Sequence, residues 1–295
     1  MITRRTLLAG LFALSWSMLN PLAALADNFT SDRISVKTEG TGSDVILIPG
    51  LNSSPRVWAE MIKAAPGHRY HLVQISGFAG QPKGGNVDGL VAAPVAEEIS
   101  RYIRSEQLTK PAVIGHSMGG SIGMMLAARH PQMVSRLMVV DMLPFLGAMF
   151  GPPGTTAESI KPTADAMLAQ LRNADPATRQ QRSEATLNGM INTVTMRPGA
   201  IDDSIRSDLD VSARAYHELI VTDLTPELIH IAVPSTVLYV LPKGVPVTEA
   251  QLDTFYQFAY TSLKGVTLKR VGASAHFIMW DQAEQFHSEV KTFLH

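Results

Sequence analysis

Short apolar runs alternate with longer amphipathic stretches between about residue 44 and residue 141. The short runs are rich in β-branched residues, which is typical of buried strands, and the longer stretches carry apolar residues at helical spacing. This alternation predicts a parallel sheet with helices on both faces. The predicted strands cover 33–40, 44–50, 70–76, 111–116 and 135–141. A first helix is predicted to begin after Ser54, which can cap it, and two further helices are predicted at 95–108 and 119–130.

The alternation stops after Asp141 and returns near residue 235. Helical spacing dominates the part between, over 158–174, 176–194 and 212–221, and no strand pattern occurs there. Strands are then predicted at 235–241 and 266–271, and helices at 248–265 and 283–294. We therefore expect an α/β core formed by residues 27–144 and 231–295, interrupted by a helical cap or lid at residues 145–230.

The first 26 residues have the pattern of an export signal. Arg4 and Arg5 precede an apolar run, and Ala24-Leu25-Ala26 closes it as a small-x-small cleavage site. Cleavage after Ala26 would leave a periplasmic or secreted protein without a membrane anchor. The paired arginines resemble a twin-arginine signal, and ordinary Sec export stays open as the alternative.

The composition indicates which partners and cofactors are not expected. The formal net charge is -1, with no basic run, so nucleic acid is not an expected partner. Cysteine is absent, so an exported chain must be stabilised by its core without disulfides. We find no metalloprotease or P-loop motif, and we expect no metal and no cofactor.

The sequence Gly115-His116-Ser117-Met118-Gly119 stands between a predicted strand and a predicted helix. A G-x-S-x-G sequence in this setting is typical of a sharp turn that exposes the serine hydroxyl. Side chains two residues before and after the serine would collide across the turn, so both positions need glycine. The helix N-terminus then directs free N–H groups toward the same point, which favours developing negative charge. His116 is expected to be a spacer.

The chain resembles the α/β-hydrolase family in its "GHSMGG" turn and its order of elements. This resemblance implies a serine esterase- or lipase-like enzyme, with Ser117 as the nucleophile on the strand-five equivalent and the lid after the sixth-strand equivalent. It makes His276, in "GASAHF" after the last predicted strand, the general base. The oxyanion hole is expected at the backbone N–H of Met118 and of Leu51, where this chain has "PGL" in place of the family's "HG-x".

The acid that orients the histidine is less clear from the sequence. The family usually places it after the strand that follows the insertion, but no Asp or Glu appears there before Glu249, at the start of a helix. Asp141 ends the strand directly after the helix of the serine, and some family members place the acid there. Asp141 is the first choice, Glu249 is the alternative, and a chain with neither is the third possibility.

The run "MLPFLGAMFG" after Asp141 suggests an apolar pocket without an arginine cluster. The resulting hypothesis is a serine hydrolase of the carboxylesterase type (EC 3.1.1) that cleaves small-molecule esters with an apolar part through a Ser-His-Asp triad and an acyl-enzyme. An acyltransferase or a C–C bond hydrolase could use the same site. A non-catalytic ligand-binding protein on a hydrolase scaffold is the alternative from another class.

Overall fold

The computed structural model describes residues 29–242 and 244–295, so the expected export signal at residues 1–26 lies outside the described residues. Seven strands form one sheet in the order β1-β3-β2-β4-β5-β6-β7, and every neighbouring pair is parallel except β1 with β3. The strands are β1 (Ile34–Gly40), β2 (Ser43–Ile48), β3 (His68–Ile75), β4 (Ala112–His116), β5 (Arg136–Val140), β6 (Ser235–Tyr239) and β7 (Thr267–Arg270). The expected mostly parallel sheet is therefore confirmed.

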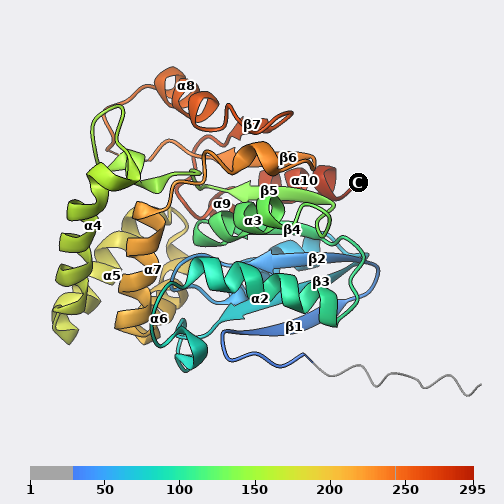
Figure 1. Cartoon of the computed structure of the whole chain (residues 1–295), viewed down its shortest axis with the longest axis horizontal. Coiled ribbons are helices and arrows are strands. Elements are labelled where there is room, and N and C mark those ends of the chain that lie inside the picture. The colour runs from blue at the N-terminus through green and yellow to red at the C-terminus, as the bar shows by residue number, and fades with distance from the viewer. Residues whose placement is uncertain (1–28, 243) are drawn as a thin grey trace, which may run out of the picture.

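Helices cover both faces of this sheet (Figure 1). Alternate residues of the central strands point to opposite faces, so Ile46 and Ile48 pack with one helical layer while Val45 and Leu47 pack with the other. The first layer contains α2 (Ala92–Ser105), α3 (Met118–Arg129) and α8 (Glu249–Ala259), and the second contains α1 (Ala59–Ala64), α9 (Ile278–Asp281) and α10 (Ala283–Leu294). Both faces are buried, which explains the continuous apolar runs of β2 and β4.

Four helices lie between β5 and β6 and gather beyond one end of the sheet (Figure 1). They are α4 (Ala157–Arg172), α5 (Pro176–Met190), α6 (Arg197–Arg206) and α7 (Leu209–Val221). We call residues 145–230 the inserted segment. It has a small apolar cluster of its own around Phe145, Ile160 and Ile220.

Two buried carboxylates connect the inserted segment to the core. Glu218 on α7 accepts three backbone N–H groups at the start of α2, at 2.6–2.8 Å. Asp203 on α6 accepts from the Ser54 hydroxyl at 2.6 Å and forms an ion pair with Arg56. A buried carboxylate needs such donors to offset its loss of hydration. The position of α6 and α7 over the sheet is thus fixed by specific polar contacts.

Two local expectations were wrong, and one helix was not predicted. Ser54 makes no side-chain capping bond; its hydroxyl donates to Asp203 and accepts from the Nε–H of Arg56 at 3.3 Å. The sequence pattern missed α6, whose segment opens with Arg197-Pro198-Gly199 and has no regular apolar spacing. Helix α8 ends at Ala259, six residues before the predicted end at Gly265. The capping box of Thr248 with Gln251 is confirmed.

Candidate active site

Ser117 lies in the tight turn between β4 and α3, with a φ of 53°. A Cβ atom at position 115 would collide with the carbonyl of Gly119, and one at position 119 would collide with the carbonyl of Ile48. Both flanking positions therefore require glycine, the second because of β2 rather than because of the turn itself. The backbone N–H of Ser117 donates to the carbonyl of Val140 at 2.9 Å, which fastens the strained turn to β5.

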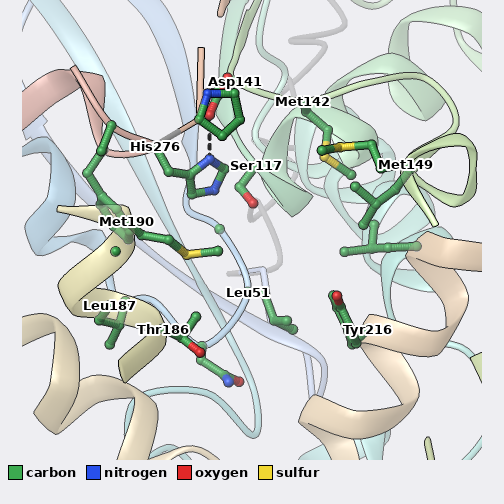
Figure 2. Close-up of a pocket in the computed structure, with 18 of the residues that line it drawn as sticks. Leu51, Ser117, Asp141, Met142, Met149, Thr186, Leu187, Met190, Tyr216 and His276 are labelled. Carbon is green, nitrogen blue, oxygen red and sulfur yellow. Dashed lines mark hydrogen bonds and ion pairs between the residues drawn. The ribbon is translucent and has the colours of Figure 1, made fainter. Parts of the chain in front are cut away.

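His276 and Asp141 form a direct contact, although 135 residues separate them in the sequence. The distance from His276 Nδ1 to Asp141 Oδ2 is 2.6 Å, and Figure 2 shows the His276 ring beside Ser117, with Asp141 on the far side of the ring. Asp141 directly follows β5 with a φ of 53°, and its other carboxylate oxygen accepts the backbone N–H of Val240 at 3.1 Å. The structure thus places a serine, a histidine and an aspartate from three loops at the carboxyl ends of parallel strands, where ligands of such sheets bind.

Glu249, the alternative acid, lies elsewhere. It begins α8, its side chain is exposed, and it pairs with Arg270 at 2.9 Å. The arrangement therefore brings Asp141 to the histidine and leaves Glu249 on the surface.

The two expected oxyanion donors come from two different segments next to the serine. Met118 is the first residue of α3, so its N–H is one of the unpaired donors that a helix N-terminus offers. Leu51 follows Gly50 in the loop after β2, and a Cβ at Gly50 would lie 3.0 Å from Ser117 Cβ. The next residue, Asn52, has a φ of 58°, and its Oδ1 is 2.5 Å from the hydroxyl of Ser212 on α7. The loop after β2 thus adjoins Ser117 and is held by the inserted segment.

His116 has a role that the sequence did not suggest. Its ring is buried, its centroid is 4.6 Å from that of His276, and its Nε2 is 3.1 Å from the His276 carbonyl oxygen. Burial, and the nearby His276, hold the pKa of His116 well below its usual range. A neutral His116 can donate its Nε2–H to that carbonyl. His116 therefore supports the loop of His276 rather than acting only as a spacer.

Asp281 holds the same loop from the other side. Its carboxylate accepts the backbone N–H of Ala275 at 2.9 Å and those of Asn192 and Thr193 at 2.8–3.0 Å. It thereby joins the residue before His276 to the end of α5. No motif marks Asp281 in the sequence, because its partners are backbone groups of distant segments.

A pocket of about 1030 Å³ opens in front of Ser117, between the sheet and the inserted segment. Figure 2 shows Met190 and Leu187 on one side and Met149 and Tyr216 on the other. Its lining is mainly apolar and includes residues of the predicted run, namely Met142, Leu143, Leu146, Met149 and Phe150.

Arg179 and Arg182 on α5 also line this pocket, in contrast to the expectation of a pocket without an arginine cluster. Arg179 donates to the carbonyls of Ser204 and Ser207 at the end of α6. Arg182 donates to the carbonyl of Gln170 near the end of α4 at 3.4 Å. Both guanidinium groups thus compensate the C-termini of neighbouring helices.

Within residues 29–242 and 244–295, no three His, Cys, Asp or Glu side chains gather as a metal site requires. In the same ranges, every helix is too short or too polar to cross a bilayer.

Residues 45–216, more than half of the 295-residue chain, match the family model described as the alpha/beta hydrolase fold. A Serratia proteamaculans protein named as a carbamate hydrolase, RutD, is 34% identical over 103 residues, which are 35% of this chain and 38% of that protein. The chain therefore spans about two fifths of the length of this curated relative. A pimeloyl-acyl-carrier-protein methyl ester esterase of Vibrio vulnificus is 25% identical over 243 residues, which are 76% of this chain and 88% of that protein.

Solved structures have the same architecture. The esterase EaEST from Exiguobacterium antarcticum superimposes with a TM-score of 0.72 at 19% identity, over 88% of this chain and 95% of that chain. The enol-lactonase from Burkholderia xenovorans LB400 superimposes with a TM-score of 0.71 at 17% identity, over 88% of this chain and 96% of that chain. At these identities the likeness is one of fold.

Proposed function

Because the chain belongs to the α/β-hydrolase fold family, we propose that it is a serine hydrolase that cleaves carboxylic esters with an apolar acyl or alcohol part. The observation that carries this proposal is the 2.6 Å contact between His276 Nδ1 and Asp141 Oδ2 beside Ser117. A serine hydroxyl is a weak nucleophile unless a base removes its proton, and a histidine acts as that base when a carboxylate fixes its tautomer.

In the proposed mechanism, His276 Nε2 accepts the proton of the Ser117 hydroxyl as its oxygen attacks the ester carbonyl. The N–H groups of Met118 and Leu51 stabilise the oxyanion of the tetrahedral intermediate. The imidazolium then protonates the leaving alcohol, and an acyl-enzyme remains on Ser117. Water, deprotonated by His276, attacks this acyl group, and the carboxylic acid leaves as Ser117 recovers its proton.

The pocket supports an apolar substrate. Its volume of about 1030 Å³ lies at the upper end of the range of small-molecule sites, about 300–1000 Å³. Met149, Phe150, Leu187 and Met190 would bury an acyl or alcohol chain by the hydrophobic effect. The relatives named above as esterases act on esters, which favours the same bond type here.

A fluorophosphonate probe tests this function directly. We expect the probe to label the purified protein and the labelled peptide to contain Ser117, because such probes react only with an activated serine. Hydrolysis of a panel of p-nitrophenyl esters should then be fastest with medium-length acyl chains. Absence of both labelling and turnover would favour the ligand-binding alternative, whereas transfer to an added alcohol would favour the acyltransferase.

We also propose that the enzyme is exported and acts in the periplasm, on the basis of the signal pattern in residues 1–26. The full-length chain expressed in a bacterium should give a periplasmic form that begins at Asp27. N-terminal sequencing of the fractionated protein measures this. A cytoplasmic form that keeps Met1 would contradict the proposal.

A further inference from the structure

One face of α5 forms a wall of the Ser117 pocket, and its chemistry changes along the helix. From the C-terminal end of α5 toward its start, the wall passes from apolar to hydroxyl to arginine side chains: Met190, Leu187, Thr186, Ser183, Arg182 and Arg179. The apolar end adjoins the loop of His276, because the backbone N–H of Phe277 donates to the carbonyl of Met190 at 3.3 Å. Figure 2 shows Met190 close to His276, with Leu187 and Thr186 further from it. The arginines therefore stand at the end of this wall that is remote from the reacting atoms.

The separation of the two ends of this wall follows from helix geometry. Arg182 precedes Met190 by eight residues, and Arg179 precedes it by eleven. At a rise of about 1.5 Å per residue, these positions lie about 12 Å and about 16 Å from Met190 along α5. An extended chain advances about 1.1–1.2 Å per bond, because a residue of three backbone bonds spans about 3.3–3.6 Å. A substrate chain of about ten bonds is therefore long enough to pass from the side of His276 to Arg182.

Most donors of the two guanidinium groups have no protein partner. Arg179 donates from Nη2 to the carbonyls of Ser204 and Ser207, and Arg182 donates from Nη1 to the carbonyl of Gln170 at 3.4 Å. Within residues 29–242 and 244–295, neither arginine forms an ion pair, and their other N–H groups make no hydrogen bond. Because a guanidinium group has five N–H donors and keeps its charge, most of this donor capacity is available to a bound molecule.

The surroundings leave this positive charge without a counter-ion. Both arginine side chains are partly buried, and burial lowers the pKa of Arg179 although the charge of Asp208 opposes this shift. Asp208 itself forms an ion pair with Lys83 at 3.2 Å and caps α7. Among the described residues that line the pocket, Asp141 is the only carboxylate, and it is paired with His276. Partly desolvated cations beside a mainly apolar space attract an anion more strongly than exposed cations do.

We propose that Arg179 and Arg182 bind an anionic end group of the substrate, so that the substrate is an ester whose apolar chain ends in a carboxylate. The inference rests on the proposed function and narrows its substrate class. The two oxygens of a carboxylate match the planar fork of a guanidinium group. Met190 and Leu187 would cover the apolar part of the chain, while the arginines would hold its end.

The monomethyl and dimethyl esters of decanedioic acid test this assignment, because they have the same chain and differ in the charge at its end. We expect the wild-type kcat/KM for the monomethyl ester to exceed that for the dimethyl ester about tenfold or more. The monomethyl ester of butanedioic acid should show no such advantage over its dimethyl ester, because its carboxylate cannot reach the arginines. Titration of the released acid at constant pH measures these rates.

The acetate ester of ω-hydroxydecanoic acid carries the carboxylate on the alcohol side, and its own methyl ester is the neutral control. A preference for the charged form in either long-chain pair supports the proposal, and the pair that shows it assigns the arginines to the acyl or the alcohol part. Active wild-type protein without this preference in both pairs would overturn the proposal.

Arg182→Gln and Arg172→Gln form the matched pair of variants. Each removes one positive charge from the inserted segment, but Arg172 pairs with Asp210 at 2.6 Å and is absent from the pocket lining. Arg182 makes only one long bond to the protein, so its replacement should leave the fold intact. We expect Arg182→Gln to lower the ratio of charged to neutral ester about tenfold, mainly through KM, and Arg172→Gln to keep the wild-type ratio. Equal ratios in the two variants would contradict a specific site.

A binding measurement separates this inference from the proposed function. Monomethyl decanedioate should bind to Ser117→Ala in a calorimeter, and it should bind about tenfold more weakly when Arg182→Gln is added. Adding Arg172→Gln instead should leave the affinity unchanged. Wild-type protein that neither hydrolyses esters nor reacts with fluorophosphonate would overturn the proposed function, yet this binding would still test the arginines. Equal affinities in the Arg182→Gln and Arg172→Gln backgrounds would overturn the anion site.

Discussion

Replacing Ser117 with alanine is expected to lower kcat/KM for p-nitrophenyl esters by about 10⁵- to 10⁶-fold. The substitution removes the oxygen that would form the acyl-enzyme, and no other hydroxyl group of the pocket lining belongs to the strained turn. Binding in the apolar pocket would survive, so the loss should fall on kcat with little change in the affinity for a non-hydrolysable ester analogue. Steady-state kinetics and calorimetric binding of the analogue measure the two effects.

Ser121→Ala is the matched control. Ser121 lies one turn further along in α3, is buried whereas Ser117 is partly exposed, and is absent from the pocket lining. We expect this variant to keep wild-type kinetics and full labelling by fluorophosphonate. Thermal unfolding of both variants verifies that they fold. If Ser117→Ala kept more than about one hundredth of the wild-type kcat/KM while folded, a nucleophile at this position would be excluded.

Local patterns were sufficient to predict the elements of the core. The strand β4, the turn at Ser117 and the helix α3 follow from residues that adjoin one another, and the reason for Gly115 is steric and local. The position of His276 after the last strand could be predicted because the residues that mark this turn, in "GASAHF", adjoin the histidine in the sequence. The prediction of α6 failed because its ten residues have no apolar stripe.

Local sequence patterns could not decide which groups complete the site, because these contacts join segments far apart in the sequence, and Glu249 therefore stayed open as the alternative to Asp141. Asp141 meets His276 across 135 positions, and the backbone N–H of Val240 reaches Asp141 only because β6 lies beside β5. His116 and Asp281 bind backbone groups, which leave no mark in the sequence of the partner. The order of the strands places these groups at one edge of the sheet. This order depends on the complete fold and cannot be derived from any local sequence pattern.

The second large effect is expected for Asp141→Asn, which should lower kcat/KM by about 10³- to 10⁴-fold. An asparagine can keep the contact with His276 Nδ1, but its amide can donate an N–H to this nitrogen, whereas the aspartate can only accept one. The imidazole would then carry its proton on Nε2, where it cannot accept the proton of Ser117. The amide would also leave the imidazolium of the transition state without a counter-charge. The loss should therefore appear in kcat.

Glu249→Gln decides between the two acids named by the sequence. Glu249 is exposed and pairs with Arg270 across the surface, and such pairs contribute about 0–1 kcal/mol to stability. We expect this variant to keep wild-type kinetics. Its kcat/KM should therefore exceed that of Asp141→Asn by three orders of magnitude or more. A large loss in Glu249→Gln together with an active Asp141→Asn would reverse the assignment, because a catalytic histidine can take its tautomer from only one carboxylate at a time.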